Sequence, residues 1–99
     1  MSVASPVEHQ TSPYVRLEGR LDAETSPTTL CRLAKHLRRG GRLFVDASRL
    51  ESCDVSGLEM LRRLHDVAAY RGASIRLVRP SPPVRRALQR CGLGGIVLF

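Results

Sequence analysis

The strongest constraint on the fold of this 99-residue chain is a regular alternation of short strand patterns with helix patterns. Several segments alternate polar and apolar residues, which is the period of a half-buried strand. Between them, apolar residues recur every three to four positions, as on one face of a helix. Strands that alternate with helices of this length form crossover units with parallel strands. The order predicts an α/β domain with a mixed, mostly parallel sheet of four to five strands and about three main helices.

Four strands are predicted from these patterns, at residues 14–18, 42–47, 74–79 and 95–99. A further short strand is expected around residues 3–9, although Pro6 weakens it. Residues 1–12 are therefore expected to form a mobile segment or a short edge strand, followed by a single domain over residues 13–99. Residues 48–55 are expected to form a loop.

Each of the three helices is predicted from the residues at its start. Ser26-Pro27 begins the first, because serine is a favourable N-cap and proline suits the first helical position. Ser56 is expected to cap the second, since Glu59 three residues later completes a capping box. Ser81-Pro82 begins the third.

The composition excludes several classes of protein. No apolar run approaches the ~20 residues of a membrane helix, so no membrane insertion is expected. The first ten residues lack the basic and apolar regions of a signal peptide. Three widely spaced cysteines, an odd number, fit a reduced cytoplasmic chain and not a disulfide scaffold.

The positive charge does not by itself predict nucleic-acid binding. The net charge is +7, and fifteen arginines accompany a single lysine. This bias fits a nucleic-acid surface or a GC-rich genome equally well. The arginines are scattered along the chain, and four aromatic residues are too few for a base-stacking platform. We therefore expect no nucleic-acid partner.

The sequence also lacks the common signatures of enzymes. It has no GxGxxG, no phosphate loop ending in GK[ST], no GxSxG and no HExxH. His36 and His65 lie in predicted helices and are expected to be partly buried or exposed side chains, not metal ligands. Cys53 precedes a helix start, where the dipole can lower the pKa of a thiol, so inert packing and redox sensing are both considered for it. We predict no catalytic residue, no metal site and no cofactor.

The most informative stretch runs from residue 45 to residue 58. A strand ends near Asp46, and after a loop a helix begins at residues 54–58. The free N–H groups of that first turn and the positive end of the helix dipole point outward. Because parallel strands end at one edge, Asp46, Asp54 and Asp22 are expected to cluster there. For each aspartate, a local structural role and a binding role remain open.

Five short motifs, in their order and spacing, together resemble the STAS domain, which is the fold of bacterial anti-sigma factor antagonists. The resemblance covers residues from about Tyr14 to Phe99. The motifs are Gly19-Arg20-Leu21-Asp22, Asp46-Ala47-Ser48, Asp54-Val55-Ser56-Gly57-Leu58, Ser81-Pro82-Pro83-Val84 and Cys91-Gly92-Leu93.

The resemblance implies a protein–protein binding module with no catalysis of its own. Antagonists of this family bind an anti-sigma factor that is also a serine kinase, and their binding releases the sigma factor. The kinase phosphorylates a serine at the start of the second helix, and the phosphorylated form dissociates. We expect the protein to be cytoplasmic and to be a monomer or weak dimer. Its partner-binding residues would be Asp22, Asp54, Val55, Ser56, Gly57 and Leu58.

The chain departs from the family pattern at the phosphorylation site. The usual motif is Asp-Ser-[Ser/Thr]-Gly-Leu, whereas this chain has Val55 at the acceptor position, and valine has no hydroxyl group. Two interpretations of the neighbouring Ser56 stay open. It is the N-cap of the helix, or it is a displaced phosphoacceptor.

A second role within the same family also fits the sequence. Some STAS subunits dock on the ATPase of an ABC-type lipid transporter and lack the phosphoserine. Val55 makes this alternative attractive, because a subunit without phosphoregulation needs no hydroxyl group there.

Overall fold

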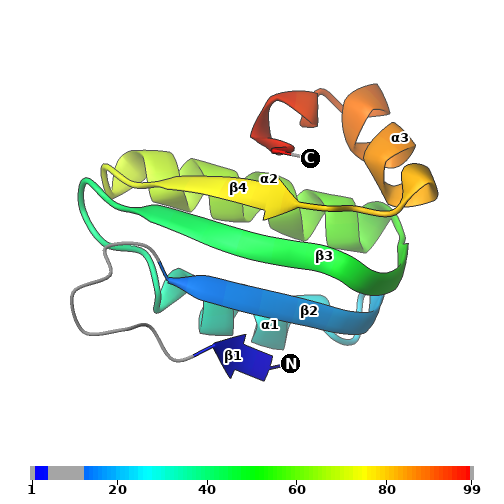
Figure 1. The fold of residues 1–99 in the computed structure, drawn as a ribbon, viewed down its shortest axis with the longest axis horizontal. Coiled ribbons are helices and arrows are strands. Elements are labelled where there is room, and N and C mark those ends of the chain that lie inside the picture. The colour runs from blue at the N-terminus through cyan, green and yellow to red at the C-terminus, as the bar shows by residue number, and fades with distance from the viewer. Residues whose placement is uncertain (1, 5–12, 99) are drawn as a thin grey trace.

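The computed structural model describes residues 2–4 and 13–98 of the chain (Figure 1). Three α-helices, four strands and one short 3₁₀ helix follow one another along these residues. In chain order they are β1 (Ser2–Ala4), β2 (Tyr14–Leu21), α1 (Ser26–Ala34), β3 (Arg42–Cys53), α2 (Val55–Tyr70), β4 (Ser74–Val78), α3 (Pro82–Arg90) and η1 (Gly94–Ile96). The predicted α/β class with three main helices is confirmed.

The sheet has the strand order β1-β2-β3-β4. Its parallel part contains three strands, β2, β3 and β4, whereas four to five strands were expected for the whole sheet. The three-residue β1 adds to this part in the antiparallel direction, with Val3 opposite Val15. The rest of the strand expected at residues 3–9, and most of the segment 1–12 expected to be mobile or an edge strand, lie outside the described residues.

The closing strand predicted at residues 95–99 is wrong. Gly94–Ile96 forms a 3₁₀ helix, and within the described part of this segment, up to Leu98, only Val97 makes a parallel bridge, to Leu77. Leu93 and Ile96, which are 3% and 4% exposed, both point into the core. They are three positions apart, which suits the three residues per turn of a 3₁₀ helix and not the two-residue period of a strand.

The two helices that connect the parallel strands lie on the same face of the sheet. Figure 1 shows α1 and α2 behind the strands, and the two helices pack against each other. Successive right-handed crossovers that move in one direction across a sheet produce this arrangement. The third helix and η1 lie along the β4 edge. The core between sheet and helices is made of buried aliphatic side chains, among them Val15, Val45, Leu61, Leu64 and Leu77.

Strand β3 is longer than expected and replaces the predicted loop at residues 48–55. It continues to Cys53 by pairing residues 49–53 with the second half of β2, after irregular register between Arg16 and Glu18. Such a bulge inserts extra residues while keeping apolar side chains directed inward, and Leu50 is 3% exposed. The extension ends β2 and β3 side by side, with Leu21 opposite Cys53.

Candidate functional site

The start of α2 is held by Asp54, the residue that precedes the helix. Asp54 has an extended backbone conformation, and its carboxylate accepts a hydrogen bond from the Gly57 N–H at 3.0 Å. This is the geometry of an N-cap, which satisfies one of the free N–H groups of the first turn. The prediction that Ser56 caps the helix with Glu59 is wrong, because Ser56 is already the second residue of the helix. The first helix differs in the same way, since Thr25 and not Ser26 occupies its N-cap position.

The helix start is also fixed against the ends of β2 and β3. The Asp54 N–H donates to the Leu21 carbonyl oxygen at 3.2 Å. Gly57 is buried against the same strand, and a Cβ atom there would lie 2.5 Å from the Leu21 oxygen. Glycine is therefore required here for the close approach of the helix to the strand backbone. The first turn of α2 is therefore rigidly placed at the edge of the sheet.

The outer side of this helix start faces solvent. The side chain of Val55 is 70% exposed, although it is apolar. Asp54 is exposed as well, whereas Ser56 and Leu58 are half-buried. Among the described residues, no hydrogen bond engages the Ser56 hydroxyl group. The segment 54–58 thus presents an apolar residue between a carboxylate and a hydroxyl on a fixed backbone. We call it the docking segment.

Asp22 lies beside the docking segment, at the end of β2. Its carboxylate accepts hydrogen bonds from the backbone N–H groups of Glu24 at 3.0 Å and Thr25 at 3.1 Å. This is an Asx turn, the structural role considered for this residue. The hydrogen bond from the Thr25 backbone is the main reason that the pKa of Asp22 lies below its ordinary value. The carboxylate is therefore charged at neutral pH.

The third aspartate of the expected cluster lies elsewhere. Asp46 is in the middle of β3, opposite Arg16, which lies five residues before the end of β2. Its residue is fully buried, and its carboxylate accepts hydrogen bonds from the Tyr14 hydroxyl at 2.5 Å and from Arg79 at 2.9 Å. The structure brings Asp22 and Asp54 together but not Asp46, because β3 continues past the point where the sequence predicted its end.

The Asp46 network is structural and was not predicted. Burial disfavours the charged form, but hydrogen bonds from Tyr14, Ser48 and Arg79 outweigh it, so the pKa of Asp46 lies far below its usual range. The hydrogen bond to Asp46 in turn raises the pKa of Tyr14. Tyr14 and Arg79 are 32 and 33 positions away from Asp46 in sequence, and no local pattern joins them. Arg79 also has a left-handed backbone, with φ of 54°.

The cysteine and histidine residues considered as redox or metal-binding groups do not form such a site in the described part of the chain. Burial, with a smaller contribution from Asp54, raises the pKa of Cys53 to about 11, which favours inert packing over redox sensing among the two interpretations considered. His65 lies in α2, whereas His36 lies beyond the end of α1 and not within a helix. Within residues 2–4 and 13–98, no three His, Cys, Asp or Glu side chains form a possible metal site. No helix in the same residues is long and apolar enough to cross a membrane.

The docking segment belongs to two sequence stretches whose net charge is opposite to that of the whole chain, and arginines flank both stretches directly. Residues 21–31 and 50–61 form the α1 and α2 starts and the adjoining strand ends. They contain no lysine or arginine, although the chain has 16 such residues. They do contain five of its nine acidic residues. We call these five the acidic rim: Asp22, Glu24, Glu51, Asp54 and Glu59.

The sequence matches one protein-family model over most of its length. The model described as "Mlab, STAS domain" matches residues 5–98, which includes the docking segment and the acidic rim. No curated protein matches the chain in sequence.

Solved structures share this fold. The anti-sigma factor antagonist SpoIIAA in its unphosphorylated form superposes with a TM-score of 0.71 and 25% identity, covering 98% of this chain and 86% of that one. The Bacillus cell fate determinant SpoIIAA in the phosphorylated form gives 0.69 and 22%, with 98% and 89% covered. The SulP transporter STAS domain from Vibrio cholerae gives 0.70 and 15%, with 94% and 76% covered.

Proposed function

Because the chain belongs to the STAS domain family, we propose that it is a binding protein of the anti-sigma factor antagonist type. In this proposal the docking segment contacts an anti-sigma factor that is also a serine kinase, and the contact releases a sigma factor. The chain acts by occupying a surface of its partner and catalyses no reaction itself. The likeness to SpoIIAA at 25% identity supports this choice among the roles of STAS domains.

The observation that carries the proposal is the exposed and rigid start of α2. Val55 is 70% exposed at the centre of a polar surface, and the cap by Asp54 and the contact of Gly57 with β2 fix its backbone. An apolar side chain surrounded by polar groups is typical of the centre of a protein–protein contact. A preformed backbone lowers the entropy lost on binding.

Regulation by phosphorylation is a separate part of the proposal, and it concerns Ser56. The hydroxyl of Ser56 is not used as a cap, because Asp54 already fills that position. A phosphate on Ser56 would add about −1.5 to −2 charges at neutral pH beside Asp54 and Glu59. The positive end of the α2 dipole stabilises this charge within the fold. At a partner contact, the same charge and its bound water would oppose docking.

Size-exclusion chromatography with the anti-sigma factor kinases of the same genome, purified and mixed with the chain and ADP, tests the binding. Val55→Asp should abolish co-elution, since it places a charge at the centre of the contact. Tyr70→Asp is the matched control, because Tyr70 is 93% exposed at the other end of the same helix. The proposal fails when no kinase of this class co-elutes with the wild-type chain.

Intact mass measurement after incubation with the same kinases and ATP tests the regulation. One added phosphate that fragmentation places on Ser56 supports a displaced acceptor. Ser56→Glu should then weaken co-elution much more than Ser56→Ala does. An unmodified chain that still binds the kinase would leave an antagonist without a phosphorylation switch, and the Ser56 part of the proposal would be wrong.

The specific observation of Val55 at the usual acceptor position favours a second candidate. A STAS subunit that docks on the ATPase of an ABC-type lipid transporter needs no hydroxyl group at this position. Such a role is compatible with the family model that matches and with the likeness to a transporter STAS domain. Affinity purification of the chain from its own organism separates the two, because recovery of a transporter ATPase without an anti-sigma factor favours the second candidate.

A further inference from the structure

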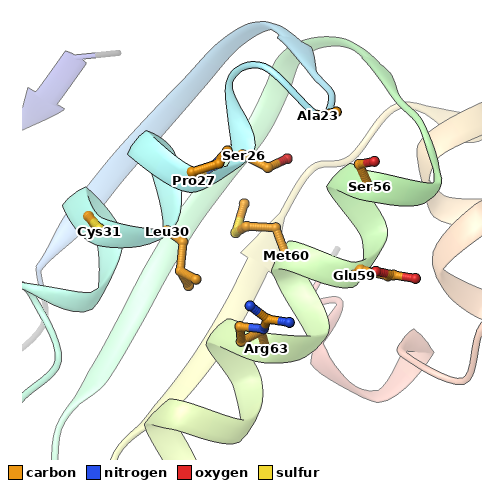
Figure 2. Close-up of a pocket in the computed structure, with 9 residues that line it drawn as sticks. All are labelled: Ala23, Ser26, Pro27, Leu30, Cys31, Ser56, Glu59, Met60 and Arg63. Atoms are coloured by element: carbon orange, nitrogen blue, oxygen red, sulfur yellow. The ribbon is translucent and has the colours of Figure 1, made fainter.

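A groove between α1 and α2 lies next to the docking segment and has no part in the proposal so far. Figure 2 shows it between the N-terminal halves of the two helices. Its volume is about 390 Å³. Its apolar lining includes Pro27 and Leu30 from α1 and Met60 from α2. Ser56 belongs both to this lining and to the docking segment, so the groove continues the docking surface.

The wall of the groove contains a buried hydroxyl group without a partner. Ser26 is 7% exposed, and its Oγ atom has no hydrogen-bond partner within the described part of the chain. Its backbone N–H is already bonded to the Asp22 carbonyl oxygen at 2.9 Å, so only the side chain is unsatisfied. Figure 2 shows this oxygen directed toward the α2 side of the groove. A buried polar group of this kind is unfavourable until a hydrogen-bonding group meets it.

The charges beside the groove indicate what kind of occupant it accepts. Glu59 lines the groove, and the other members of the acidic rim lie on the same two helix starts and strand ends. Arg63 is the one basic residue among the nine that line the groove. The lining itself therefore has one charge of each sign, and the excess of negative charge lies beyond it, on the helix starts and strand ends, where it favours basic residues of a ligand.

We infer that the groove receives an aliphatic side chain of the protein partner, from a segment that also carries arginine or lysine. The aliphatic group packs between Leu30 and Met60, a polar group of the same segment meets the Ser26 hydroxyl, and the basic residues face the acidic rim. The inference rests on the proposed function, because it describes a second contact of the partner that docks at Val55.

Two tryptophan variants of α1 test the inference through partner affinity. Cys31 is exposed and lines the groove, so Cys31→Trp fills it without entering the core. Thr28→Trp is the control, since Thr28 is exposed on the same helix but lines a different surface. We expect the filled groove to weaken partner binding by about tenfold or more, and the control by less than about threefold. Circular dichroism and thermal melts verify that both variants fold.

Alkylation of Cys31 by iodoacetamide provides a second readout that does not depend on a variant. When the partner occupies the groove, the Cys31 thiol should react at least about tenfold more slowly than in the free chain. Peptide mass mapping separates Cys31 from the other two cysteines. A partner that binds through Val55, tolerates Cys31→Trp and leaves Cys31 reactive would overturn the groove inference while the proposed function stands.

A peptide probe decides the case in which no candidate partner binds. That result refutes the proposed function, and the groove is then titrated with acetyl-Arg-Leu-Leu-Arg-amide and followed by ¹H–¹⁵N correlation spectra. Chemical-shift changes at Ser26 and Met60 that disappear in Cys31→Trp support the groove as a site for a cationic aliphatic segment. Absence of shifts at these residues at millimolar peptide overturns it.

Discussion

Gly57 lies so close to β2 that a Cβ atom at this position would be 2.5 Å from the carbonyl oxygen of Leu21. The same atom would be 2.8 Å from the sulfur of Cys53, at the end of β3. Real Cβ atoms do not approach backbone oxygens this closely, so only glycine fits without a shift of the helix. The position of the docking segment therefore depends on a residue with no side chain.

Substitution of Gly57 by alanine should destabilise the fold and displace the start of α2. Since the opposing Leu21 atom belongs to the backbone of a paired strand, it cannot rotate away. We expect a loss of about 1–3 kcal/mol in the free energy of unfolding, as for other overpacked sites. Urea denaturation measures it. Gly95→Ala is the control, because a Cβ there meets nothing within 4 Å, and an equal loss in both variants would refute the close contact.

The cap of α2 leads to different predictions for Asp54 and Ser56. Asp54→Ala removes the acceptor for the Gly57 N–H and should lower the free energy of unfolding by about 1 kcal/mol. Asp54→Asn keeps an acceptor and should lose less. Ser56→Ala should have an effect within about 0.5 kcal/mol, because Ser56 caps nothing. Thermal melts of the three variants check this order, and a larger loss for Ser56→Ala would restore the capping box.

The difference between sequence and structure at this site has a physical cause. The alternating patterns locate β2, β4 and the three helices, because local periodicity determines which side chains can be buried together. Local patterns do not show how far a strand continues by pairing with its neighbour. Because residues 49–53 pair with β2, β3 ends at Cys53 and not at residue 47, where the sequence pattern predicted its end. Asp46 therefore lies inside the strand and not at the sheet edge, and the N-cap of α2 is Asp54 and not Ser56.

The contacts that arise only in three dimensions were not predicted at all. The side chains of Tyr14 and Arg79 meet Asp46 across strands. The groove needs the starts of α1 and α2 side by side. In contrast, the residues proposed for docking could be located from the sequence, because a helix start after a parallel strand lies at the sheet edge in any fold of this class.

The buried carboxylate of Asp46 should make stability depend on acid pH. Its pKa is lower in the folded chain than in the unfolded chain, so its contribution is fully present above the unfolded value, near 3.8. The contribution is lost as the pH falls from there toward the folded value. Asp46→Asn should therefore lower the free energy of unfolding at pH 7 by about 1–3 kcal/mol, and it should unfold at a lower urea concentration than the wild type. The difference in the free energy of unfolding between wild type and variant should become smaller below about pH 4.

A surface aspartate controls for the loss of charge alone. Asp66 is exposed on α2 and forms no ion pair within the described residues, so Asp66→Asn should change stability by less than about 0.5 kcal/mol at pH 7. A gap between wild type and Asp46→Asn that stays constant from pH 7 to pH 3 would mean that the Asp46 carboxylate is not favoured in its charged form.

Cys53 should be the slow cysteine of the folded chain, although it lies next to a helix start. Burial raises its pKa to about 11 from an ordinary value of 9.0, so at pH 8 its thiolate fraction is about a hundredth of that of an ordinary thiol. Iodoacetamide should therefore label the exposed Cys31 at least about ten times faster than Cys53. The Cys53 rate should rise about tenfold for each pH unit between 8 and 10, which peptide mass mapping can follow. In urea the difference should vanish, because unfolding exposes both thiols. Fast labelling of Cys53 in the folded chain at pH 8 would show that the helix dipole outweighs burial at this position.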